Sequence, residues 1–163
     1  MKTAADWIEE LALQRHPEGG WYAEWYRARL TLPVKALGAQ GDGTRSVATS
    51  IYYLLEPEDF SAFHRIRSDE VWHHLAGDSL AVEQIQPGGT AETLLLGGNE
   101  GLPAGVVTAG TWFGARPAGS GYALVGCTVS PGFDFEDFEL AERDRLTQVF
   151  PQHEALIAGL TRG

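Results

Sequence analysis

Two side chains of different chemistry stand at the spacing of a metal-binding hairpin. His64 is followed by Ile66, Glu70 and Gly77, which fits the pattern His, one residue, His, three residues, Glu, six residues, Gly, except that isoleucine replaces the second histidine. Alternate residues of a strand share one face, so this pattern aims its side chains into a barrel. Because Ile66 has no donor atom, we predict a pocket that keeps this geometry without a metal or other cofactor.

His64 and Glu70 are the predicted catalytic pair. If residues 62–67 and 70–76 form a hairpin around a turn at 68–69, His64 and Ile66 share one face, and Glu70, Trp72 and His74 share the facing side. In an apolar cavity, burial raises the pKa of a carboxylic acid, and a nearby carboxylate raises that of an imidazole. The alternatives are a hydrogen-bonded pair that braces the hairpin and, as a minority view, a metal triad of His64, Glu70 and His74.

Aromatic residues are further candidates for the same pocket. Tyr53 and Tyr122 are predicted to supply a phenolic proton opposite the histidine; alternatively, both fill the barrel with their hydroxyls hydrogen-bonded. Trp72 and Trp112 are predicted to stack on a ring-shaped ligand, and His74 to bind it. Tryptophans in a barrel more often fill space, so that alternative stays open.

Charged residues are also considered at the mouth of the pocket. Glu18, in a turn rich in glycine, reaches the mouth or caps its own loop. Arg116, with Arg27 and Arg65, is a candidate for an arginine cluster that would hold a small anion. The alternative, that each arginine is exposed on a strand face, agrees with the general placement of charged residues.

Composition and charge narrow the possible partners. The chain has 163 residues, one cysteine (Cys127) and a net charge of -10. Its length and lack of linker-like tracts predict a single domain over residues 1–163. The negative charge disfavours nucleic acid and anionic membrane surfaces, and no run approaches the roughly 18 apolar residues of a membrane span. A lone cysteine and an N-terminus without a signal-peptide core predict a cytoplasmic protein.

Periodicity predicts an all-β fold with peripheral helices. Thr3 and Asp6 have the spacing of a helix cap, and Trp7, Ile8 and Leu11 then share one helical face. A second helical pattern begins at about residue 141, and the glycines within 38–45 predict a mobile loop. The segments between the helices are typical of short strands in a sandwich or barrel. They cover residues 22–30, 46–55, 62–67, 71–76, 80–86, 92–96, 106–108, 112–116 and 122–129.

The residues of the predicted pocket resemble the motifs of the cupin superfamily. His64, Glu70 and Gly77 resemble its first motif, and residues 117–119 resemble the Pro-x-Gly turn of its second. Tyr122 and Gly126 stand where that second motif has histidine and asparagine. The resemblance implies a cupin double-stranded β-helix, or jelly roll, that lacks two of the four usual metal ligands.

Most of the chain is similar to a narrower family, the small cytoplasmic cupins of DUF985 (cupin 5). Four strings in the same order carry the resemblance, at residues 16–22, 50–55, 60–73 and 126–138. Membership implies a compact barrel, commonly a homodimer, whose structural relatives include sugar-nucleotide epimerases and germin-like storage proteins. The family brings no settled reaction.

Three functions remain open at this point. The leading hypothesis is a metal-independent epimerase or isomerase of a sugar-like substrate, because that chemistry needs only a tuned base, a tuned acid and a closed pocket. A non-catalytic module that binds a small polar ligand is the alternative. A metal-dependent cupin enzyme is the minority hypothesis.

Overall fold

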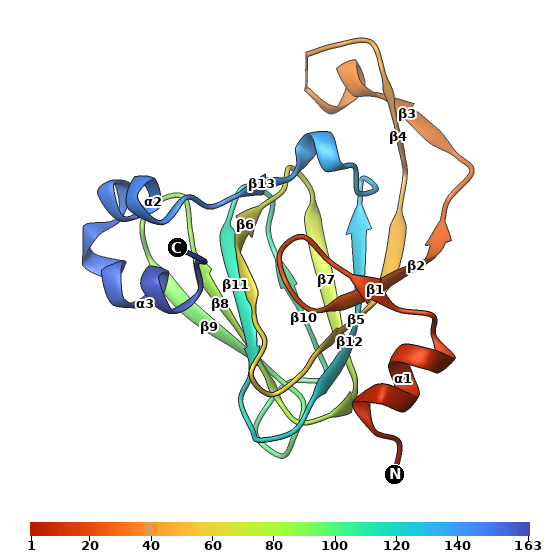
Figure 1. The fold of residues 1–163 in the computed structure, drawn as a ribbon. Coiled ribbons are helices and arrows are strands. Elements are labelled where there is room, and N and C mark those ends of the chain that lie inside the picture. The colour runs from red at the N-terminus through yellow and green to blue at the C-terminus, as the bar shows by residue number, and fades with distance from the viewer. Residues whose placement is uncertain (39) are drawn as a thin grey trace.

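The computed structural model describes residues 1–38 and 40–163, which form two facing antiparallel β-sheets with helices at the periphery (Figure 1). The glycine-rich loop predicted over 38–45 includes residue 39, which lies outside the described residues. This arrangement confirms the all-β cupin fold class, including the peripheral helices at both ends of the chain.

The larger sheet has six strands. In spatial order they are β1 (Gln14–Arg15), β2 (Trp21–Arg27), β5 (Thr49–Leu55), β12 (Ala123–Ser130), β7 (Asp69–Gly77) and β10 (Ala104–Val107). Along β7 buried and more exposed residues alternate, as a strand with one face on the core requires.

The smaller sheet has five strands and faces the first. Its order is β13 (Glu139–Leu140), β6 (Ser61–Arg65), β11 (Trp112–Pro117), β8 (Leu80–Ile85) and β9 (Ala91–Leu96). A separate pair, β3 (Thr31–Pro33) and β4 (Thr44–Ser46), projects from the sandwich, with the 3-10 helix η1 (Val34–Leu37) between its strands (Figure 1). Every strand predicted from periodicity has a counterpart among these elements, with shifted ends.

The predicted hairpin between residues 62–67 and 70–76 is wrong. β6 pairs with β11 and β13, and β7 pairs with β12 and β10, so the two strands belong to different sheets. The residues between them carry the chain across the sandwich: Ile66 is buried, and its carbonyl accepts a hydrogen bond from Gly110 N at 2.9 Å. His64 and Glu70 therefore approach the same interior from opposite sheets.

The main core lies between the sheets and is aromatic at its centre. Tyr53, Trp72 and Phe113 are almost fully buried, together with aliphatic residues from both sheets. Trp72 meets the other two rings edge-on, with ring centroids 6.2 Å apart in each pair. This packing joins the two sheets through aromatic contacts at the centre of the sandwich.

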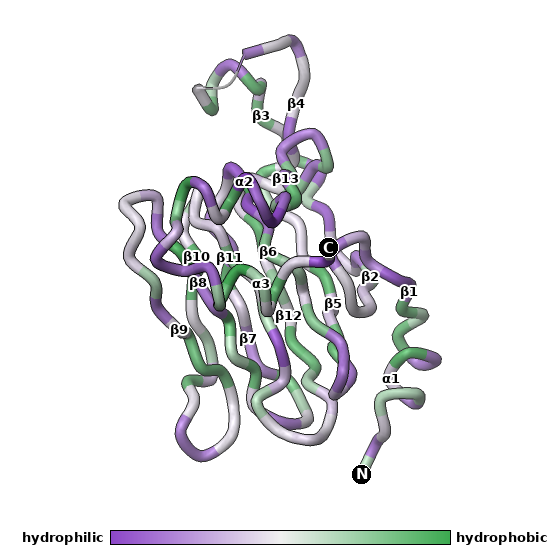
Figure 2. Tube along the Cα trace, turned by 60° about the vertical axis from the view of Figure 1, so that its left-hand side comes forward, coloured by the Kyte–Doolittle hydropathy of each residue, from purple (hydrophilic) through white to green (hydrophobic). Residues whose placement is uncertain are grey.

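The helices cover the outer surfaces of the two sheets. α1 (Ala4–Glu10) begins at the predicted Thr3–Asp6 cap, and its apolar side packs beside Leu54 of β5 and Leu124 of β12. Figure 2 shows hydrophobic segments along α1. At the other end of the chain, Leu146 and Ile157 pack on the smaller sheet. The C-terminal elements are the 3-10 helix η2 (Phe135–Asp137), α2 (Arg143–Val149), the 3-10 helix η3 (Pro151–His153) and α3 (Glu154–Gly159).

Candidate functional site

A cavity of about 690 Å³ borders the main core, with which it shares Ile66, Cys127 and Val129. Strands β2, β5, β7 and β12 form one wall, and His64 of β6 stands on the other. The loop after β1 adds His16 and Glu18, and the segment after β12 adds Phe133 and Phe135. The cavity is within the usual range for a small-molecule site.

Glu18 and His64 form the central polar contact of this cavity. Glu18 Oε2 lies 3.0 Å from His64 Nε2, and both residues are buried. On its other side the His64 ring reaches the carbonyl oxygen of Ala62, 2.7 Å from Nδ1. A carbonyl only accepts hydrogen bonds, so Nδ1 carries a hydrogen.

The contact between Glu18 and a neutral His64 needs a hydrogen on the carboxyl group, because the ring hydrogen on Nδ1 already faces the Ala62 carbonyl. Burial lowers the pKa of His64 to about 4, so the ring is neutral and its Nε2 can only accept. Burial also raises the pKa of Glu18, although the positive form of His16 would oppose that shift. We infer a neutral pair in which the Glu18 carboxylic acid donates to His64.

His16 completes this end of the cavity and was not among the predicted site residues. Its Nδ1 accepts a hydrogen bond from the backbone N–H of Glu18 at 3.2 Å and lies 3.6 Å from Glu18 Oε2. Burial lowers the pKa of His16, so this imidazole is also neutral near pH 7. The spacing His16-Pro17-Glu18 ahead of two glycines was the available signal, because it places two titratable side chains in one tight turn.

The turn that carries Glu18 depends on its glycines. Gly19 has a φ of +109°, and a Cβ atom at this position would lie 2.2 Å from the carbonyl oxygen of Phe60. Only glycine can adopt this conformation so close to another backbone segment. The turn therefore directs Glu18 inward while its backbone packs against the start of β6.

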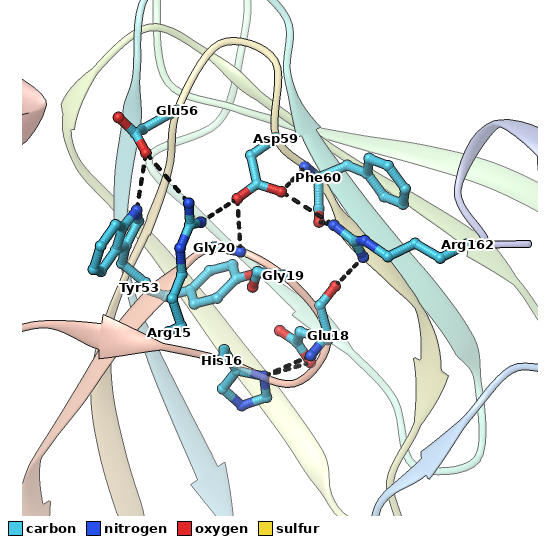
Figure 3. A network of polar contacts seen from close by, with 11 residues as sticks. Arg15, His16, Glu18, Gly19, Gly20, Tyr53, Glu56, Asp59, Phe60 and Arg162 are labelled. Atoms are coloured by element: carbon cyan, nitrogen blue, oxygen red, sulfur yellow. Dashed lines mark hydrogen bonds and ion pairs between the residues drawn. The ribbon is translucent and has the colours of Figure 1, made fainter.

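A polar network holds the same turn from outside the cavity (Figure 3). Arg162 Nη1 donates to the carbonyl oxygen of Glu18 at 2.6 Å, and Arg162 Nη2 lies 3.1 Å from Asp59 Oδ1. The other oxygen of Asp59 accepts from Gly20 N at 3.0 Å and from Arg15 Nη1 at 2.7 Å. Arg162, close to the C-terminus, thus positions the backbone of the Glu18 turn.

Glu70 stands across the cavity from the Glu18–His64 pair, on β7. It is 8% exposed, and burial raises its pKa to about 8. The Cys127 thiol lies beside it and lines the same wall. Ile66 also lines the cavity, so the residue that interrupts the motif has an apolar side chain there.

Four of the predicted site residues lie in the core or in contacts outside the cavity. Tyr53 and Trp72 are core residues, although the Tyr53 hydroxyl supports the Glu18 turn by donating to the Gly19 carbonyl at 2.6 Å. Tyr122 lies beside α1, where its hydroxyl donates to Lys2 O and accepts from Trp7 Nε1. His74 Nε2 contacts the Asp78 carbonyl oxygen at 2.8 Å. The structure does not bring Tyr122 and His74 to the cavity.

The other predicted ligand-binding residues are also separated from the cavity. Trp112 lies on the outer side of the smaller sheet under α2, with the Arg65 guanidinium 4.6 Å from its ring centre. Arg116 is half exposed and approaches Glu83 at 3.7 Å. Arg27 lines the cavity but pairs with Glu24. The three arginines considered for an anion cluster do not converge.

The residues present do not fit the metal that cupin motifs usually hold. Ile66 offers no donor, and both nitrogens of His64 are engaged, by Ala62 and by Glu18. Over residues 1–38 and 40–163, no three His, Cys, Asp or Glu side chains are grouped so as to hold a metal ion. The predicted alternative triad with His74 is therefore not assembled, since His74 lies elsewhere.

Comparisons with known proteins agree with the fold. The family described as Cupin superfamily (DUF985) matches residues 5–141. The uncharacterized protein YML079W of Saccharomyces cerevisiae is 29% identical over 94% of this chain and 83% of its own length. Among the described residues no helix is long and apolar enough to cross a membrane.

Solved structures show the same arrangement over nearly the whole chain. Protein SO0799 of Shewanella oneidensis is 39% identical with a TM-score of 0.88, covering 99% of each chain. A hypothetical protein of Leishmania major is 34% identical with a TM-score of 0.89, covering 99% of this chain and 100% of its own. The oxalate decarboxylase of Bacillus subtilis is 14% identical with a TM-score of 0.56, over 90% of this chain and 37% of its own, which is a likeness of fold alone.

Proposed function

The chain belongs to the DUF985 family of the cupin superfamily, and we propose that its cavity binds a small polar ligand and isomerises or epimerises it by proton transfer. The observation that carries this proposal is the placement of the Glu18–His64 pair and Glu70 on opposite sides of one cavity. A sugar-like substrate is part of the proposal because hydroxyl groups suit the polar atoms that line this cavity.

The two sides have complementary proton chemistry. Glu70, whose pKa burial raises to about 8, is the base: it ionises when a ligand binds, and its carboxylate then removes the proton from carbon. The acid on the opposite side is the Glu18–His64 pair, whose carboxyl proton is delivered to the other face of the same carbon. Proton removal on one face and return on the other inverts a carbon centre next to a carbonyl.

Exchange of carbon-bound hydrogen with solvent tests the catalytic part. The protein is first screened by thermal shift against nucleotide sugars, amino sugars, sugar acids and keto acids, because a ligand that binds the native state raises its stability. Each hit is then incubated in D₂O and examined by mass spectrometry. We expect deuterium to enter the ligand with the wild-type protein and His73→Gln, whose exposed histidine also lies on β7, and not with Glu70→Gln.

A non-catalytic binding module is the second candidate. Both nitrogens of His64 already have partners, Ala62 O and Glu18 Oε2, so the Glu18 proton reaches a ligand only after a rearrangement. A hit that stabilises the wild-type protein yet never exchanges a carbon-bound hydrogen would favour this function over isomerisation.

A homodimer is part of the proposal, with a second copy on the outer face of the six-stranded sheet. Val71 on β7 points away from the core, and Trp25 on β2 and Val106 on β10 are also exposed, at 57% and 48%. Val71 and Val106 pair across the adjacent strands β7 and β10, and Trp25 lies on β2 toward the other edge of the sheet. Exposed apolar residues on a sheet are typical of association surfaces. Light scattering should give twice the chain mass for the wild-type protein and the chain mass for Trp25→Ser/Val106→Ser.

We place the protein in the cytoplasm. Cys127 is buried as a free thiol, which suits a reducing compartment. Fractionation of cells that produce the chain would show it with cytoplasmic markers, and its appearance in an oxidising or membrane fraction would contradict this placement.

A further inference from the structure

We propose that the ligand of this cavity is an organic cation, a polar molecule that carries a protonated amine. This inference rests on the proposed function, since it names the chemical class of the ligand that the cavity binds. It is carried by the charges that line the cavity, by the state of its imidazoles and by the lack of an ionic partner for Glu70.

Acidic groups dominate the cavity wall. Glu18 and Glu70 lie in the interior, and Glu24 and Asp134 also line the cavity. Among the lining residues that the structure describes, Arg27 is the one permanent cation. Its guanidinium is committed to Glu24 through contacts of 2.7 and 2.8 Å and to the Phe133 carbonyl oxygen at 3.2 Å.

The two imidazoles do not offset this acidity at neutral pH. Burial lowers the pKa of both His16 and His64, so each ring is neutral. A phosphate or carboxylate placed here would lose its hydration without gaining a free cation as partner. Burying an unpaired charge is costly, so the cavity selects against anionic ligands.

Glu70 supplies the position for a cationic group. Its carboxyl is almost completely buried, lines the cavity and makes no ion pair with the described residues. The neighbouring Cys127 thiol, a weak donor, is also neutral because burial raises its pKa. An ammonium group beside Glu70 would form a charge-assisted hydrogen bond to the ionised carboxylate.

Aromatic rings favour the same ligand class. Tyr22, Phe133 and Phe135 all line the cavity, and the His16 ring stands 4.6 Å from Tyr22 and 6.2 Å from Phe135. The faces of aromatic rings attract cations, most strongly where water is excluded. Carboxyl groups flanked by aromatic rings thus combine the two interactions that stabilise a buried amine.

Binding of such a ligand should release a proton. Glu70, with a pKa of about 8, is protonated in the free protein at pH 6.5 and ionises when a cation arrives. Glu18, which also has a raised pKa, faces the same space from the opposite side and acts in the same direction. His16 and His64, which are neutral, do not take up the proton that Glu70 releases. The exception would be a transfer of the Glu18 proton to His64.

The test compares three probes of one size and different charge: glucosamine, glucose and glucuronate. Calorimetric titrations at pH 6.5 in two buffers of different ionisation enthalpy give both affinity and proton release. We expect glucosamine to bind the wild-type protein at least roughly tenfold more tightly than glucose, the scale of one charge-assisted contact, with release of close to one proton. Glucuronate should bind most weakly.

Matched variants separate this inference from the proposed function. Glu70→Gln should abolish the proton release and the preference for glucosamine over glucose, while His73→Gln, exposed on the same strand, should change neither. Binding of glucose or glucuronate as tight as that of glucosamine would overturn the cationic ligand and leave the binding function standing. Failure of all three probes to bind would overturn both.

Discussion

Glu18 Oε2 lies 3.0 Å from His64 Nε2, and this contact joins a loop before β2 to a strand of the smaller sheet. It closes a polar chain that runs from the Ala62 carbonyl through the imidazole to the carboxyl group. The chain sets the tautomer of His64 and leaves the inner end of the cavity without a net charge.

Removal of the Glu18 carboxyl should destabilise the fold. Glu18→Ala leaves the buried Nε2 acceptor of His64 without a donor, so the free energy of unfolding should fall by about 1–3 kcal/mol. In Glu18→Gln the amide N–H can replace the lost donor, and the decrease should be smaller. Urea denaturation measures both, with the exposed Glu58→Ala as control. Equal losses in the Ala and Gln variants would contradict the donor role of Glu18.

Stability should fall as the pH rises from 6.5 to 8. Glu70 ordinarily titrates near 4.5 but has a pKa of about 8 when folded, so between these values the folded state holds a proton that the unfolded state has released. The free energy of unfolding should drop by about 1–2 kcal/mol over this range, because the slope of 1.36 kcal/mol for each pH unit applies while Glu70 is fully protonated and halves at its pKa. His16 and His64 have the opposite effect, because their pKa values are lowered in the folded state: the free energy of unfolding rises with pH as they titrate. This rise ends near their ordinary pKa of 6.5, so it does not offset the decrease between pH 6.5 and 8.

Glu70→Gln isolates this effect. Urea denaturation at pH 6.5 and pH 8 should show a much smaller difference in the variant than in the wild-type protein. Some slope should remain, because the raised pKa of Glu18 acts in the same direction. A variant with the full wild-type pH dependence would show that Glu70 is not the group that titrates, and Glu58→Gln, on the surface, should behave as wild type.

Much of the fold was predictable from the sequence, while the contacts of the site were not. Strand periodicity and the Thr3–Asp6 cap depend on neighbouring residues, so local patterns were sufficient to find them. The same alternation placed both His64 and Glu70 toward the interior. The sheet to which each strand belongs depends on long-range pairing, and for this reason the hairpin prediction failed.

The approach of Glu18 to His64 also depends on distant segments. The Gly19 turn packs against Phe60, and Arg162 reaches it from the other end of the chain. No periodic pattern encodes either contact. The spacing after the Pro-x-Gly turn suggested Tyr122 for the cavity. Its hydroxyl instead hydrogen-bonds Trp7 and Lys2 beside α1, and sequence spacing does not predict where α1 packs.

Ile66→His should introduce affinity for a divalent metal. Ile66 lines the cavity together with His64 and Glu70, so an imidazole at position 66 returns the missing donor of the motif. A thermal shift with Zn²⁺ should exceed that of the wild-type protein, and a metal at about 100 times its Kd adds about 2.7 kcal/mol of stability. The double variant Ile66→His/His64→Ala should lose this gain. An equal Zn²⁺ shift in wild type and Ile66→His would show that Ile66 does not control metal binding.

Arg162 should control the order of the turn that carries Glu18. Arg162→Ala removes the donors to the Glu18 and Phe60 carbonyls and also the guanidinium that lies 4.0 Å from the Phe60 ring centre. The free energy of unfolding should therefore fall by about 1–3 kcal/mol. The amide of Gly20, bonded to Asp59, should exchange with solvent faster in this variant. Arg145→Ala, an exposed arginine on α2, is the control. Unchanged exchange at Gly20 would show that the turn holds its conformation without the C-terminal arginine.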